Sequence, residues 1–143
     1  MQMPDVNVLV DAWHVDSAFH LRASDWLNQA VTSPTPLGLS DHVLSGAIRI
    51  LTNPRIPGMA WPIEDVLDVV DDLVSSPGTG IIRPGRRHWT SFTDLCRKLG
   101  ATGNLTPDCY LAALAIENKA TFVSRDRFFA SVPGLTWSDL PDN

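Results

Sequence analysis

Short apolar runs alternate with longer amphipathic segments along the chain. The runs 37–39, 80–83, 121–124 and 135–137 are predicted as short strands. The segments between them carry apolar residues at helical spacing. Strands separated by helices favour a parallel sheet that is covered on both faces and joined by right-handed crossovers. The pattern therefore predicts an α/β fold.

Helix boundaries are predicted from capping residues and breakers. Ser40 and Thr106 are expected N-caps, Pro107 suits the first turn of a helix, and Gly100 is expected to end one. The predicted helices cover residues 19–31, 41–51, 62–74, 89–99 and 107–118, with a short helical piece over 125–130.

Length and charge narrow the class of protein. The 143 residues suit a single domain, which we expect to span residues 1–143. The formal net charge of −5 disfavours nucleic-acid binding by bulk charge, so any contact with nucleic acid must be made by a local basic patch. The longest apolar run, 110–116, is too short to cross a membrane, and the first residues do not resemble a secretory signal. We expect a cytoplasmic protein with no membrane partner.

Three aspartates stand where a parallel sheet places its functional site, at the carboxyl ends of strands. Asp5 precedes the apolar run 6–10, Asp108 lies in a first helical turn, and Asp126 follows the strand that ends at Ser124. Taken singly, these residues suit a solvated terminus, a helix-start acid and a turn or cap. Taken together, converging carboxylates are tolerated mainly when a cation neutralises them. Oxygen ligands select Mg²⁺ or Mn²⁺, and a phosphodiester would complete the coordination shell.

Several motifs, in this order and at this separation, resemble a known family. They are the segments 5–10, 49–55, 103–108, 124–129 and 133–137, whose sequences are DVNVLV, RILTNPR, GNLTPD, SRDRFF and PGLTW. The chain resembles the PIN-domain ribonuclease toxins of the VapBC type over nearly its full length. No single motif is highly specific, so the resemblance depends on all of them together.

The resemblance implies a three-layer α/β/α sandwich with a central, mostly parallel sheet. It implies that Asp5, Asp108 and Asp126 hold Mg²⁺ or Mn²⁺ and hydrolyse RNA as a metal-dependent endoribonuclease. Asn7 and Ser124 match the polar positions that orient these acids. The implied partners are an RNA substrate, a cognate antitoxin and a second copy of the chain in a homodimer.

Two positions depart from the family pattern. Gly46 stands where the family often has a glutamate, and Phe128 stands where a further acid sometimes occurs. Asp41 is a poor substitute because it lies about 140° around the helix from Gly46. The alternative is a degenerate PIN domain that binds RNA or antitoxin without cleaving. An aspartyl-phosphate phosphatase is disfavoured, because Asn7 replaces the second acid that this chemistry needs.

The remaining features allow more than one interpretation. The segment 83–88 is the densest positive charge, so Arg86 and Arg87 are candidate RNA contacts, although a solvated loop is the simpler interpretation. The sequence does not decide whether Arg49 pairs with a buried acid or with a partner chain. The lone histidines are expected to be structural or exposed, and the five tryptophans are expected to pack in the core or at an interface. Cys96 and Cys109 lack metal or redox spacing and are expected to be buried apolar residues.

Overall fold

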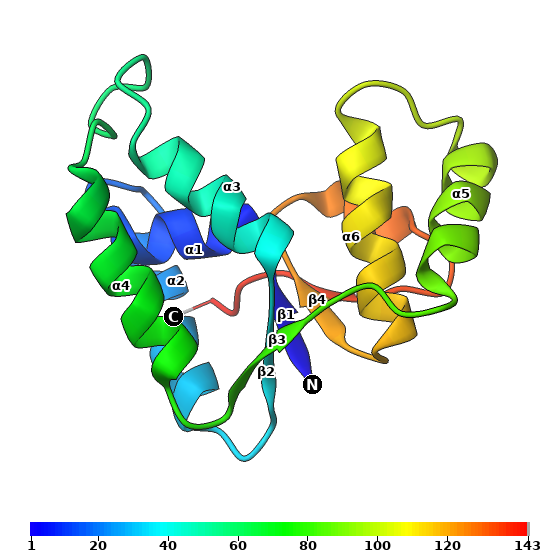
Figure 1. The fold of residues 1–143 in the computed structure, drawn as a ribbon, viewed down its shortest axis with the longest axis horizontal. Helices are drawn as coiled ribbons and strands as arrows, with labels where there is room; N and C mark the ends of the chain where they lie inside the picture. Colours follow the sequence, from blue (N-terminus) through cyan, green and yellow to red (C-terminus); the bar gives the residue numbers. More distant parts are fainter. Residues whose placement is uncertain (143) are drawn as a thin grey trace.

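A parallel sheet of five strands forms the centre of the structure, a computed structural model that describes residues 1–142 (Figure 1). The strands are β1 (Gln2–Pro4), β2 (Leu37–Ser40), β3 (Thr79–Ile82), β4 (Thr121–Val123) and β5 (Thr136–Ser138). Their order across the sheet is β3-β2-β1-β4-β5, and each neighbouring pair is parallel. The predicted parallel α/β architecture is confirmed.

Helices cover both faces of this sheet. They are α1 (Val6–Trp13), α2 (His20–Thr32), α3 (Asp41–Leu51), α4 (Ile63–Ser75), α5 (His88–Leu99) and α6 (Leu105–Glu117), with a 3₁₀ helix η1 (Arg127–Ser131). Helices α1 to α4 lie on one side and α5 and α6 on the other (Figure 1). The fold is therefore the three-layer α/β/α sandwich that the resemblance implied.

The order of the strands reverses at β1. The chain runs from β1 outward through β2 to β3, and then returns to place β4 on the other flank of β1. Gln2 of β1 is thus paired with Leu37 on one side and with Thr121 on the other. Open α/β sheets bind their ligands in the crevice at such a reversal, outside the carboxyl ends of the strands. Asp5 follows β1 at this end, and Ser124 follows β4.

The core lies where helices meet the central strands. Met3 of β1 and Phe122 of β4 are fully buried, and α6 packs against both β4 and α5. Residues 111–115 of α6 are all buried, so this helix is apolar nearly all round. Cys109 is buried and Cys96 half-buried, and both are free thiols. No helix within residues 1–142 has the length and apolar character needed to cross a bilayer.

Two of the predicted helix boundaries are confirmed by the capping contacts. Ser40 caps α3, and its hydroxyl oxygen accepts a hydrogen bond from the backbone N–H of Val43 at 3.1 Å. Gly100 ends α5 with φ of 58°, a left-handed conformation that favours glycine.

The N-cap predicted at Thr106 is wrong, because α6 begins at Leu105, two residues before the predicted start, and Thr106 lies inside the helix. A turn just before the helix supplies carbonyl partners, so the backbone N–H of Thr106 donates to the carbonyl of Gly103 at 3.1 Å. The Thr106 hydroxyl donates to the same carbonyl at 2.8 Å instead of accepting from the helix. Gly103 makes this turn possible with φ of 54°. The predicted first-turn position of Asp108 is unaffected.

Candidate active site

Asp5 lies at the junction of β1 and α1. Its backbone N–H donates to the carbonyl of Val123 at 2.9 Å, so the residue is still held against β4. Its side chain caps α1, with Oδ1 accepting from the backbone N–H of Val6 at 2.7 Å. Only 8% of Asp5 is exposed. The start of the helix therefore fixes this carboxylate and leaves Oδ2 for other partners.

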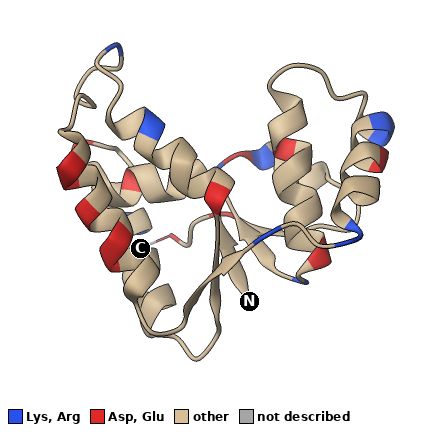
Figure 2. Ribbon diagram, in the orientation of Figure 1, with Lys and Arg blue, Asp and Glu red and all other residues tan. Residues whose placement is uncertain are grey.

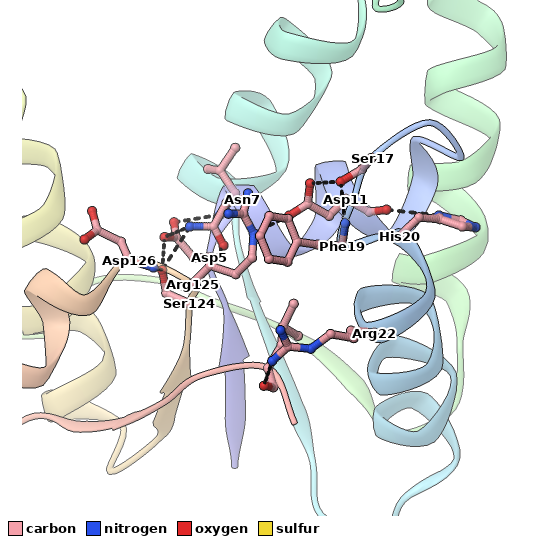
Figure 3. Close-up of polar contacts among 12 residues, drawn as sticks. Asp5, Asn7, Asp11, Ser17, Phe19, His20, Arg22, Ser124, Arg125 and Asp126 are labelled. Atoms are coloured by element: carbon pink, nitrogen blue, oxygen red, sulfur yellow. Dashed lines mark hydrogen bonds and ion pairs between the residues drawn. The ribbon is translucent and has the colours of Figure 1, made fainter. Parts of the chain in front are cut away.

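The buried hydroxyl of Ser124 connects Asp5 to the segment after β4 (Figure 3). Ser124 Oγ donates to Asp5 Oδ2 at 2.6 Å. It accepts from Asn7 Nδ2 and from the backbone N–H of Asp126, each at 3.0 Å. Asn7 Nδ2 also donates to Asp5 Oδ2 at 2.9 Å. The hydroxyl thereby uses its full hydrogen-bonding capacity, and both orienting residues expected from the sequence lie against Asp5.

Asp126 lies on the opposite side of Asp5 from Asp11 (Figure 3). Its Oδ1 accepts a hydrogen bond from the backbone N–H of Phe128 at 2.9 Å and so caps η1. Asp126 is exposed, unlike Asp5. The predicted helical piece at 125–130 accordingly starts at Arg127, because Asp126 serves as its cap.

Asp108 brings a third carboxylate from the first turn of α6. The pKa of Asp108 is raised from 3.8 to about 6, mainly by burial and in smaller part by the negative charges of Asp5 and Asp126. Burial also raises the pKa of Asp5, against the lowering effect of its hydrogen bonds from Ser124 and Val6. The repulsion from Asp126 adds to this rise and the positive charge of Arg125 opposes it. The three aspartates are thus within electrostatic reach of one another.

All three aspartates line one cavity of about 850 Å³. Its walls come from α1, α3, the first turns of α6 and the segment after β4. Three basic residues also line it, namely His42, Arg49 and Arg125. Sequence reasoning left the role of Arg49 open and did not single out His42 or Arg125. The spacing of three residues between Gly46 and Arg49 puts both on one face of a helix, so the sequence could have indicated that Arg49 lines the same cavity as Gly46.

Packing explains both departures from the family pattern. A Cβ atom at Gly46 would stand 2.9 Å from Val6 Cγ2, so Val6 occupies the space that a larger residue on α3 would need. Phe128 packs against the core, with its ring centroid 5.4 Å from that of Phe129. Asp41 does not line the cavity and pairs with Arg83 at 2.8 Å. These positions therefore serve packing or a surface ion pair.

The donor set of the cavity suits a hard divalent cation, because carboxylate oxygens are the ligands such ions prefer. Within residues 1–142, however, no three His, Cys, Asp or Glu side chains are grouped closely enough to hold a metal ion by themselves. Mg²⁺ commonly keeps several waters and takes one or two carboxylates plus a substrate phosphate. The three aspartates fit an ion held partly through water and substrate.

The basic segment between β3 and α5, with its Arg residues coloured blue in Figure 2, contributes no residue to the lining of this cavity. Arg86 and Arg87 are exposed and neither lines the cavity. The loop is held by Glu117, whose carboxylate accepts from the backbone N–H of Gly85 at 2.9 Å and of Arg87 at 3.2 Å. The structure therefore does not bring these two arginines together with the aspartates.

This chain is therefore an α/β protein with a central parallel sheet and an acidic cavity at the point of strand reversal. PIN domains belong to this class of α/β proteins. The family model described as "PIN domain" matches residues 3–135. Ribonuclease VapC43 of Mycobacterium tuberculosis is 41% identical over 133 residues, which are 93% of this chain and 90% of that protein. Ribonuclease VapC33 of the same species is 34% identical over 97% of both chains. The chain belongs to the PIN-domain family and, within it, to the VapC ribonucleases.

Solved structures agree with this assignment at the level of the fold. The structure of VapBC2 from Rickettsia felis bound to a promoter DNA fragment matches with a TM-score of 0.73, 17% identity and 98% coverage of both chains. That of VapBC-1 from nontypeable Haemophilus influenzae matches with a TM-score of 0.70, 15% identity and 97% coverage of both.

Proposed function

We propose that the protein is an endoribonuclease toxin that hydrolyses RNA phosphodiester bonds with the help of Mg²⁺ or Mn²⁺. The observation that carries this proposal is the meeting of Asp5, Asp108 and Asp126 in one cavity at the strand reversal. Burial and, in smaller part, repulsion from Asp5 and Asp126 raise the pKa of Asp108, and a bound cation would relieve that repulsion. The VapC relatives, which are named ribonucleases, support the same chemistry.

In this mechanism Asp5, Asp108 and Asp126 would hold the ion. A bound divalent ion lowers the pKa of a coordinated water and offsets the negative charge of the reacting phosphate. Ser124 and Asn7 fix the Asp5 carboxylate, because both donate hydrogen bonds to its Oδ2 atom. Orienting contacts of this kind typically change metal affinity or activity by about 10- to 100-fold when removed.

The proposal includes an antitoxin partner, a homodimer and a cytoplasmic location. The solved VapBC structures that share this fold are toxin and antitoxin assemblies by name. An acidic cavity of about 850 Å³ suits a basic side chain of such a partner, which would compete with the cation. Light scattering of the purified chain, alone and mixed with a candidate antitoxin, tests both assemblies. A strictly monomeric chain would remove the homodimer from the proposal.

Cleavage of RNA by the purified protein tests the activity. Cleavage should require Mg²⁺ or Mn²⁺ and should be lost in Asp5→Asn and Asp108→Asn. Asp68→Asn is the matched control, since Asp68 is exposed on α4 and does not line the cavity. Cleavage retained in both cavity variants would remove the assignment of the site.

Calorimetry with Mn²⁺ separates the enzyme from the degenerate alternative. An enzyme with this site should bind the ion, and its free energy of unfolding should rise on binding. RNA binding without Mn²⁺ uptake and without cleavage would favour a domain that only binds.

A further inference from the structure

The guanidinium of Arg125 is held by two independent contacts at the edge of the acidic cavity (Figure 3). Its Nε donates to Asp11 Oδ2 at 2.5 Å. Its guanidinium carbon stands 4.0 Å from the centre of the Phe19 ring, which is a cation–π geometry. Its backbone N–H donates to Asn7 Oδ1 at 3.3 Å. Both the position and the plane of the guanidinium are thus fixed.

The acid that holds Arg125 is itself anchored. Asp11 lies on α1, the helix that Asp5 caps, and is only 6% exposed. Its Oδ1 accepts from Ser17 Oγ at 2.6 Å, and its backbone carbonyl lies 3.1 Å from His20 Nδ1. A carboxylate buried in this way forms a stiffer clamp than an exposed ion pair does, because it has no freedom to turn toward solvent.

The clamp leaves the outer end of the guanidinium available. Only Nε is engaged by Asp11, and within residues 1–142 neither terminal nitrogen of Arg125 donates a hydrogen bond to a protein group. Within residues 1–142, every buried side-chain nitrogen has a hydrogen-bond partner. The two terminal nitrogens of Arg125 have none, so they must be accessible to solvent, in agreement with a side chain that is 30% exposed. A guanidinium with two free N–H-bearing nitrogens matches the geometry of a phosphate group.

The negative charges around the cavity favour a fixed cation, such as the Arg125 guanidinium, beside the aspartates. An RNA phosphate that approaches Asp5, Asp108 and Asp126 meets negative charge, so a fixed cation beside them lowers the cost of approach. Arg125 lies in the chain between Ser124, whose hydroxyl binds Asp5, and Asp126, and it lines the same cavity. Resting on the proposed ribonuclease function, we propose that Arg125 binds a phosphate group of the RNA substrate and that Asp11 and Phe19 position it to do so.

RNA binding tests this proposal in the Asp108→Asn protein, which we expect to bind RNA without cleaving it. The probe is a short fluorescein-labelled single-stranded RNA of mixed sequence, and anisotropy gives its affinity over a series of salt concentrations with Mg²⁺ present. Adding Arg125→Gln should weaken binding by roughly tenfold and reduce the salt dependence by about 0.7 in log–log slope. Arg127→Gln removes the same charge at an exposed residue outside the cavity and should change affinity by about twofold or less.

The clamp that Asp11 forms on Arg125 and a general effect of charge predict opposite changes in RNA affinity. Asp11→Ala removes a negative charge, so bulk electrostatics predicts tighter RNA binding, whereas loss of the clamp predicts weaker binding. The loss should disappear in a protein that already carries Arg125→Gln, because Asp11 acts through Arg125. Phe19→Leu should give a smaller loss of the same kind.

Two outcomes would overturn the inference. One is a folded Arg125→Gln protein with the same affinity and salt slope as Arg127→Gln, and the other is tighter binding by Asp11→Ala. If Arg125→Gln does not fold, Arg125→Lys replaces it, since lysine keeps the charge but not the forked geometry, and unchanged binding would again overturn the inference. RNA cleavage by the wild-type protein is measured separately, so the proposed function stands or falls on that assay alone.

Discussion

The Asp108 carboxylate should make the folded protein less stable at neutral pH. Its pKa is about 6 in the folded protein instead of 3.8, because the side chain is half-buried and faces the charges of Asp5 and Asp126. Below pH 3.8 the carboxyl is protonated in both the folded and unfolded states, and no penalty arises. As the pH rises through about 6, the folded protein must ionise this group in an unfavourable place, and stability is lost.

The size of the effect follows from the same pKa. At about 1.4 kcal/mol per pH unit, a rise from 3.8 to about 6 corresponds to roughly 3 kcal/mol. Solvent exposure of the side chain and the favourable dipole of α6 reduce this to about 1 kcal/mol. Without divalent cations, Asp108→Asn should therefore raise the free energy of unfolding by about 1 kcal/mol near neutral pH and by almost nothing near pH 4.

Urea denaturation at the two pH values, in the presence of a chelator, measures this difference. Asp68→Asn on the exposed side of α4 is the control for removing one negative charge. The reasoning is refuted if Asp108→Asn is no more stable than the wild-type protein near neutral pH. It is equally refuted if the gain persists unchanged near pH 4, because the gain would then not depend on ionisation of the carboxyl.

Two further substitutions test the packing around the cavity. Ser124→Ala should lower the free energy of unfolding by about 2 kcal/mol, because Asp5 and Asn7 lose a buried hydrogen-bond partner; unchanged urea denaturation would contradict the network described for this hydroxyl. Gly46→Ala should be better tolerated by about 1 to 2 kcal/mol in a Val6→Ala protein than in the wild-type protein, since the new Cβ would stand 2.9 Å from Val6 Cγ2. Equal effects in both backgrounds, measured by thermal unfolding, would exclude that close contact.

The elements that the sequence predicts correctly have local causes. Ser40 and Gly100 act on their own helices through a cap and a left-handed turn, so neighbouring residues suffice to place those boundaries. The sequence does not predict α1 as a helix, because the mostly apolar segment 6–10, interrupted only by Asn7, does not distinguish a buried helix from a buried strand. Its residues 8–12 are all buried, and this burial on most sides explains why no clean amphipathic pattern appears.

The site likewise contains residues that the sequence could place and residues that it could not. Asp5, Asp108 and Asp126 follow strands or open helices, so topology alone directs them to one end of the sheet, and the structure brings them to one cavity. The pair formed by Asp11 and Arg125 joins residues 114 positions apart, and neither has a local pattern that names the other. Contacts of this kind depend on how α1 packs beside the end of β4, which only the folded chain reveals.

The hydrogen bond from Ser124 to Asp5 spans 119 positions of the chain. During translation the first carboxylate therefore leaves the ribosome long before the hydroxyl that orients it has been synthesised. A nascent or prematurely ended chain that lacks residues 124–126 has neither this hydroxyl nor Asp126. The order of synthesis thus delays assembly of the acidic cavity until residues 124–126 have been made.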